Sequence, residues 1–129
     1  MKVLVLKNSN LKERNIKNTL EELQKIVGGY IEIPYLSERF AENNIDIIIN
    51  EEGKLIDGMT PEIAVVRGSD NQVVDVVYGN CIFASHNDMG ETVGLNDEQI
   101  AIVEEELQYS AILENKRSGK NYSVRLLHV

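Results

Sequence analysis

The chain has 129 residues, of which 43% are hydrophobic and 26% charged. This length and balance predict one compact ligand-binding domain spanning residues 1–129 and exclude a disordered chain. The single cysteine excludes an internal disulfide, and the apolar run from Val3 to Leu6 is too short for a signal peptide or a membrane span. We therefore expect a cytoplasmic protein that does not contact a membrane.

The net charge of −8 is unevenly distributed: residues 1–17 carry +4, residues 18–115 carry −16 and residues 116–129 carry +4. Nonspecific affinity for duplex nucleic acid requires many Lys and Arg residues, so the acidic excess argues against that partner. An anionic ligand is expected near one of the two basic termini. Solvated chain ends explain the same charge pattern without any ligand.

The first half of the chain predicts strands around one helix. The β-branched run at 2–8 predicts a buried strand, and 30–33 predicts a strand that Pro34 limits to an edge or an end. Between them, apolar residues at helical spacing predict a helix that starts at Asn18 or Thr19 and stops at Gly28. Residues 46–50 and 54–56 predict two strands joined by the turn at 51–53, followed by a loop.

The second half predicts two strands on either side of Gly79, the second centred on residues 81–85. A helix follows, because Ile100, Val103 and Leu107 form one stripe and Asn96 and Gln99 have capping-box spacing. The tail predicts a hairpin. With Ser118 and Gly119 as its turn, Leu113 lies opposite Val124 and Ala111 opposite Leu126.

These elements predict an α+β fold in one small domain, with a mostly antiparallel sheet, two principal helices and a C-terminal β-hairpin. The stretch "NCIFASHND" holds the only cysteine and one of two histidines. Because side chains alternate along a strand, Cys81 and His86 point to opposite faces, which disfavours a nucleophilic pair. Cys81 is expected to be a small buried core thiol, and no catalytic residue is predicted.

His86, Asp88 and Glu91 offer oxygen and nitrogen donors on one turn, but the chain has too few His and Cys residues for a closed zinc pattern. We expect no metal and no cofactor. The same residues support an alternative hypothesis, a small nucleotide hydrolase in which His86 acts with Asp88 or Glu91.

Phe83 is flanked by the small residues Cys81 and Ser85, which would leave its ring face open for a stacked base, although ordinary core packing is the alternative that the sequence alone favours. Arg117 and Arg125 lie in the acid-free tail, and guanidinium groups match phosphate oxygens two at a time. Surface ion pairs, for instance Arg125 with Glu114, are their alternative. The alternative for Asn96 is helix capping.

The segments "LEELQKIVGGYIEI", "INEEGKLIDGMTP", "YGNCIFAS" and "VGLNDEQI", in this order, resemble a family of small proteins from phages and Gram-positive bacteria. That family, long described only as a domain of unknown function, is identified here as the one that includes Thoeris anti-defence protein one. The resemblance covers about residues 1–108.

The resemblance implies a sponge, which binds a cyclic ADP-ribose isomer made by Thoeris sensors and holds it intact. It also implies a homo-oligomer, dimeric or hexameric, with cyclic oligonucleotides as further possible ligands. The family's ligand-binding roles fall on Phe83 for stacking on adenine, Asn96 for a polar contact, and Arg117 and Arg125 for the phosphates.

We therefore predict a non-enzymatic binding protein that blocks Thoeris immunity by sequestering the signal. Two alternatives come from other classes. One is an acidic protein-interaction module that mimics nucleic acid, which the charge of residues 18–115 favours. The other is the nucleotide hydrolase based on His86.

Overall fold

The computed structural model describes residues 1–116 and 118–129. Within these residues lie three helices and ten strands. In chain order they are β1 (Lys2–Lys7), β2 (Asn10–Asn15), α1 (Leu20–Val27), β3 (Ile31–Glu32), α2 (Glu38–Glu42), β4 (Ile45–Asn50), β5 (Pro61–Arg67), β6 (Gln72–Tyr78), β7 (Cys81–His86), β8 (Thr92–Val93), α3 (Asp97–Glu106), β9 (Ser110–Asn115) and β10 (Lys120–His128).

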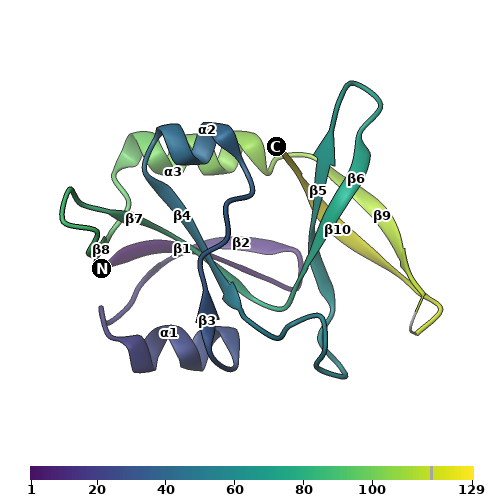
Figure 1. The fold of residues 1–129 in the computed structure, drawn as a ribbon, viewed down its shortest axis with the longest axis horizontal. Coiled ribbons are helices and arrows are strands. Elements are labelled where there is room, and N and C mark those ends of the chain that lie inside the picture. Colours follow the sequence, from purple (N-terminus) through teal and green to yellow (C-terminus); the bar gives the residue numbers. More distant parts are fainter. Residues whose placement is uncertain (117) are drawn as a thin grey trace.

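The strands form two sheets (Figure 1). The larger has the order β2-β1-β7-β4-β3, with β8 paired to β7, and the smaller has the order β6-β5-β10-β9. All paired strands are antiparallel except β5 and β10, which run parallel. The predicted α+β class, the mostly antiparallel pairing and the C-terminal hairpin are confirmed.

Both faces of the larger sheet are buried, and alternation along its strands separates two core clusters. Helix α1 covers one face, where Val3, Val5, Ile82 and Ala84 pack with its Leu23 and Val27. The other face packs against α2, α3 and the smaller sheet (Figure 1). That second cluster contains Leu4, Leu6, Phe40, Ile47, Ile63, Val65, Cys81, Phe83, Val103 and Leu127. Because it draws on both sheets, this cluster joins them.

The two predicted helices end where their capping residues lie. The Thr19 side chain accepts a hydrogen bond from the Glu22 N–H at the start of α1, and Gly28 ends that helix in the left-handed conformation. At α3, Asn96 and Gln99 form the predicted capping box. Ile100, Val103 and Leu107 are buried on its inner side, as the stripe predicts.

Five features differ from the sequence prediction. Residues 54–56 form turns rather than a returning strand, and Leu55 is 80% exposed. The polar strand β2, the strand β5 and the five-residue helix α2 were not predicted. The hairpin register is shifted by two residues, because a longer turn pairs Leu113 with Tyr122 and Ala111 with Val124. A shift of two leaves each side chain on its predicted face.

Candidate functional site

Phe83 lies in the centre of the protein and not at a surface. Its exposed fraction is 0%, and its ring meets the ring of Phe40 edge to face, with centroids 6.1 Å apart and an interplanar angle of 86°. The expectation that its face is open to a base is therefore wrong. The small neighbours Cys81 and Ser85 do not expose the ring, because α2 and the smaller sheet pack over this side of β7.

Cys81 shares this interior, and its thiol is also 0% exposed. Burial, and secondarily the charge of Glu62, raises the pKa of the Cys81 thiol, so the nucleophilic thiolate is disfavoured. Its Sγ donates a weak hydrogen bond to the carbonyl of Gly79 at 3.4 Å. Cys81 is thus the buried core thiol that the sequence predicts.

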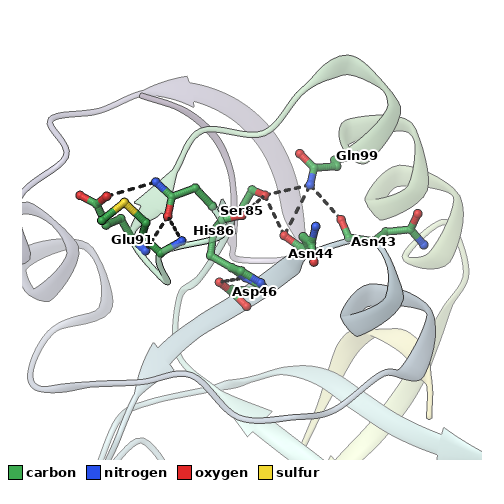
Figure 2. A network of polar contacts seen from close by, with 9 residues as sticks. Asn43, Asn44, Asp46, Ser85, His86, Glu91 and Gln99 are labelled. Carbon is green, nitrogen blue, oxygen red and sulfur yellow. Dashed lines mark hydrogen bonds and ion pairs between the residues drawn. The ribbon is translucent and has the colours of Figure 1, made fainter.

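Asn96 is occupied by helix capping, which was the alternative to a role in ligand binding. Its Oδ1 accepts a hydrogen bond from the Gln99 N–H at 2.8 Å, and the Gln99 Oε1 accepts one from the Asn96 N–H at 3.0 Å. The Gln99 amide then donates to the carbonyl of Asn43 and to Ser85 Oγ, both at 2.9 Å (Figure 2). This network fixes the start of α3 against the larger sheet.

Arg125 is half-buried, and its guanidinium binds backbone carbonyls of its own chain. Nε and Nη2 donate to the carbonyl of Ser9 at 3.3 and 2.9 Å, and Nη1 donates to the carbonyl of Leu107 at 2.6 Å. An ion pair with Glu114, the alternative to phosphate binding, is not among its contacts in the described part of the chain. Arg117 lies outside the described residues. Phe83, Asn96 and Arg125 therefore do not converge on one pocket.

Ser9, one of the two residues whose carbonyls Arg125 binds, belongs to the tight turn between β1 and β2. Asn8 and Ser9 have positive φ angles of 50° and 65°, as a two-residue hairpin turn requires. Their N–H groups each donate to the Glu62 carboxylate at 2.9 Å, and Ser9 Oγ donates to the Ser123 carbonyl at 2.6 Å. We call Glu62, Arg125, Asn8 and Ser9 the turn anchor, because they fix the hairpin to the smaller sheet.

Glu62 is 2% exposed. Burial raises the pKa of its carboxyl above the ordinary value, whereas the two turn N–H groups and the charge of Arg125 act in the opposite direction. Because burial has the largest effect, part of the cost of ionising Glu62 remains in the folded protein.

The anchored hairpin presents a row of cations on its α1 side. Val5 pairs with Lys12 and Val3 with Arg14, so both basic side chains lie on the face that α1 partly covers. Two adjacent hollows of about 230 Å³ each follow this face and share Val5, Lys7 and Arg14. We call them together the basic groove; its other lining residues are Asn8, Asn10, Lys12, Glu22, Lys25, Ile26 and Asn80.

The cations of the basic groove are free of protein partners. Among the residues that the structure describes, the side chains of Lys7, Lys12, Arg14 and Lys25 make no hydrogen bond or ion pair, and Glu22 is the only acid in the groove lining. Lys2, Arg39 and Lys54, by contrast, each contact a carboxylate. Four unpaired cations around a hollow favour binding of an anion, and Arg14 can bind two phosphate oxygens at once.

The sequence prediction missed this groove as a set of residues, although one signal was present. The net charge of +4 in residues 1–17 of an acidic chain marks the region, but the strand β2 that aligns Lys12 with Arg14 was not predicted. Without that strand, the cations are not placed on one face.

His86 contacts neither Asp88 nor Glu91, which the hydrolase hypothesis requires. Its Nδ1 lies 3.0 Å from Oδ2 of Asp46 on the neighbouring strand β4 (Figure 2). Asn87 Nδ2 donates to the carboxylate of Glu91 at 3.3 Å. In the described part of the chain, no group of three or more His, Cys, Asp or Glu side chains is placed to hold a metal ion. No helix in it is long and apolar enough to cross a membrane.

A third hollow, of about 350 Å³, lies between the larger sheet and β6. Its apolar wall includes Leu36, Ile49 and Val77, and its rim carries Glu32, Glu51, Glu52 and Asp75. We call it the acidic cleft. Lys54 lies in the same rim and forms an ion pair with Asp75.

Comparison with family models places these features in a known group of proteins. Residues 1–108 match the model described as "Domain of unknown function (DUF3846)". The chain belongs to the DUF3846 family. The matched range contains the whole basic groove and ends after α3, so the C-terminal hairpin lies beyond it. No curated protein and no solved structure matches the chain.

Proposed function

We propose that this DUF3846 protein binds a small phosphate-bearing signal molecule in the basic groove and sequesters it without changing any of its bonds. The ligand we propose is a cyclic ADP-ribose isomer, so the protein would act in the host cytoplasm as an anti-defence sponge against Thoeris. The observation that supports an anionic ligand is the set of four unpaired cations around a hollow. The identity of the ligand rests on the sequence resemblance.

The groove suits tight binding because its backbone is held before any ligand arrives. The turn anchor fixes the hairpin that carries Lys7 and Lys12, which reduces the ordering cost of binding. A sponge that competes with a receptor needs nanomolar affinity, about −12 kcal/mol. Charge-assisted contacts to two phosphates contribute about 1.5 to 3 kcal/mol each, so contacts to the rest of the ligand must supply the remainder.

We also propose that the protein works as a homo-oligomer, as the resemblance implies. The smaller sheet supports this, because Val73, Val74 and Ile112 on its strands are exposed apolar side chains that a second copy can cover. Ala64, Val66 and Val124 form a third apolar cluster on the face opposite the main core, and that cluster is buried within the chain. Half-buried Leu113 and Leu126 extend that cluster. Analytical ultracentrifugation checks the proposal, and a monomer at micromolar concentration would contradict it.

The test of sequestration uses calorimetry with a cyclic ADP-ribose isomer. We expect tight binding to the wild-type protein and at least tenfold weaker binding to each of Lys12→Gln and Arg14→Gln, because each removes a cation from the groove. Arg67→Gln is the matched control, since Arg67 is exposed on the smaller sheet, away from the groove. Equal affinities in all four proteins would show that the ligand binds elsewhere.

A second measurement separates a sponge from an enzyme. After incubation, the protein is removed by heat and the ligand in the supernatant is identified by mass spectrometry. Intact ligand is expected. Cleaved ligand would contradict sequestration, and loss of the cleavage in His86→Ala would then support the hydrolase.

The acidic cleft favours a second candidate function, binding of a basic partner protein. It combines an apolar wall with carboxylates of Glu32, Glu51 and Glu52, which complements a Lys- or Arg-rich segment. This candidate predicts a salt-sensitive complex with a basic protein and no heat of binding with the small anion. A complex that survives replacement of Glu51 and Glu52 by Gln would rule out the cleft.

A further inference from the structure

Strands β3 and β4 pair over only two residues and then separate. Ile31 pairs with Asn50 and Glu32 with Ile49. Continued in the same register, the ladder would place Pro34 opposite Ile47. Proline has no N–H to donate to the Ile47 carbonyl, so the ladder cannot continue there. The chain from residue 33 onward turns away toward α2 instead.

The backbone groups of Ile45 and Ile47 face the opening that this separation leaves. The Glu51 N–H donates to the Tyr30 carbonyl at 2.8 Å, which shows that odd-numbered residues here direct their peptide groups toward the β3 side. By the same alternation, Asp46 and Ile48 bond to β7 on the other side. Ile45 and Ile47 therefore each direct an N–H and a C=O toward the place that a longer β3 would occupy.

The opening is a hollow of about 180 Å³ that follows the edge of β4. The side chains of Ile45 and Ile47 belong to the core on the α2 side, whereas those of Asp46 and His86 lie on the opposite face of the sheet. A hollow lined from both faces of a strand runs along its backbone edge. Its other walls are Ile33, Pro34, Tyr35, Leu36, Ser37, Phe40 and Ala41.

We propose that this hollow, which we call the β4 slot, binds a planar heterocycle of the nucleobase type, with a hydrogen-bond donor beside an acceptor. One residue of a strand directs its N–H and its C=O to the same side, and Ile47 offers both groups to the slot. The acceptor of the heterocycle can accept from the Ile47 N–H while its donor bonds to the Ile47 C=O. Tyr35 lines the slot and is 72% exposed, so its ring is available to stack on the ligand. Asp46 occupies Nδ1 of His86, which leaves Nε2 for a further contact.

The size of the slot favours a heterocycle over a peptide strand. Its volume equals that of about six water molecules at 30 Å³ each. An added peptide strand needs a gap of two strand spacings, about 9.6 Å, along several residues. The segment from Ile33 to Leu36 closes the slot on that side.

The β4 slot is separate from the basic groove. β2 forms one edge of the larger sheet, and β1 and β7 lie between it and β4, so β2 and β4 are about 14 Å apart across three strand spacings. The linings of the two sites share no residue. The inference therefore does not depend on the proposed function, and loss of the basic groove should leave the slot intact.

Nitrogen-15 NMR titration of the full chain with adenosine tests the inference. We expect the largest amide shifts at Ile45 and Ile47 and no dependence on Arg14→Gln. N6,N6-dimethyladenosine, which has lost the donor of that edge, should bind at least tenfold more weakly. Equal binding of the two nucleosides, or adenosine shifts confined to residues outside the slot, would overturn the proposal.

Three substitutions complete the test, each checked for a dispersed spectrum. Ala41→Met on α2 should fill the slot and abolish the shifts, whereas Ala101→Met, at an exposed alanine of α3 that does not line the slot, should bind like wild type. Tyr35→Ala should weaken binding about fivefold to a hundredfold through lost stacking. Undiminished adenosine binding to Ala41→Met, or binding of a short peptide but not adenosine, would also overturn the proposal.

Discussion

Arg125 and Arg14 have the same side chain, but the fold uses them in opposite ways. Arg125 on β10 donates three hydrogen bonds to the carbonyls of Ser9 and Leu107. Arg14 on β2 contacts no acceptor among the described residues and lines a hollow with Lys7 and Lys12. The two aromatic rings Phe83 and Tyr35 differ in the same manner, since one is fully buried and the other is 72% exposed.

The difference shows that residue type alone does not identify a ligand-binding group. An arginine next to unpaired carbonyls or a buried carboxylate satisfies those groups first, because leaving them unpaired inside the protein costs free energy. An arginine on an edge strand beside a hollow has no buried acceptor to pair with, so its guanidinium remains available for a ligand. The turn anchor and the basic groove can therefore be distinguished by whether a substitution changes folding or binding.

Phe83→Ala should give the largest effect, and it should be on folding. Removing a fully buried phenylalanine that packs on Phe40 leaves a cavity and is expected to cost about 3 to 5 kcal/mol of unfolding free energy. Urea denaturation followed by circular dichroism measures it. Phe83→Leu, which keeps most of the volume, is the control and should cost less than half as much. An unchanged denaturation midpoint in Phe83→Ala would contradict the burial.

Arg125→Ala should rank second, with a loss of about 2 to 3 kcal/mol, because hydrogen bonds from a charged group are removed and acceptors are left unpaired. Arg125→Lys keeps the charge but cannot bond Ser9 and Leu107 together, so it should recover less than half of the loss. Denaturation of both variants is compared with wild type. A stable Arg125→Ala protein that had lost only ligand affinity would instead assign Arg125 to a binding site.

The elements that local patterns specify were predicted well. Helix α1 begins after its cap Thr19 and ends at Gly28, and α3 begins at the capping box of Asn96 and Gln99. These boundaries were predictable because capping depends on residues within one turn of each other. β2 was missed because "NLKERN" has little apolar alternation; it is held by the Asn8-Ser9 turn and by its pairing with β1. The hairpin register was two residues off, since the turn length was assigned from Ser118 and Gly119 alone.

The candidate site was harder to predict, because it depends on contacts between distant residues. Nothing near Phe83 in the sequence indicates that Phe40 and the smaller sheet will cover it. Arg125 and Ser9 are 116 residues apart in the chain, so their hydrogen bonds follow only from the packing of the two sheets. The charge of residues 1–17 was visible in the sequence, but its alignment on one face required β2.

Glu62→Gln should have a smaller effect that depends on pH. The pKa of Glu62 is raised in the folded state, so its proton-linked stability is complete below the ordinary value of 4.5 and is lost as pH rises through the raised folded pKa. Gln cannot titrate. The stability advantage of wild type over Glu62→Gln should therefore shrink from pH 4.5 upward. Denaturation midpoints of both proteins across this range test it, and an advantage that grows with pH would mean that the turn N–H groups and Arg125 outweigh burial.

Arg14→Gln should have the smallest effect on folding, within about 0.5 kcal/mol of wild type, because an exposed cation without partners holds no structure. A slight gain is expected, since Arg14 lies in the same groove lining as Lys7, Lys12 and Lys25 and the substitution reduces their repulsion. Added ligand should raise the melting temperature of wild type and not that of the variant. Scanning calorimetry with and without a cyclic ADP-ribose isomer measures both quantities. If Arg14→Gln instead lost stability as Arg125→Ala is expected to, the two arginines would serve the fold alike, and the basic groove would lose its distinction from the turn anchor.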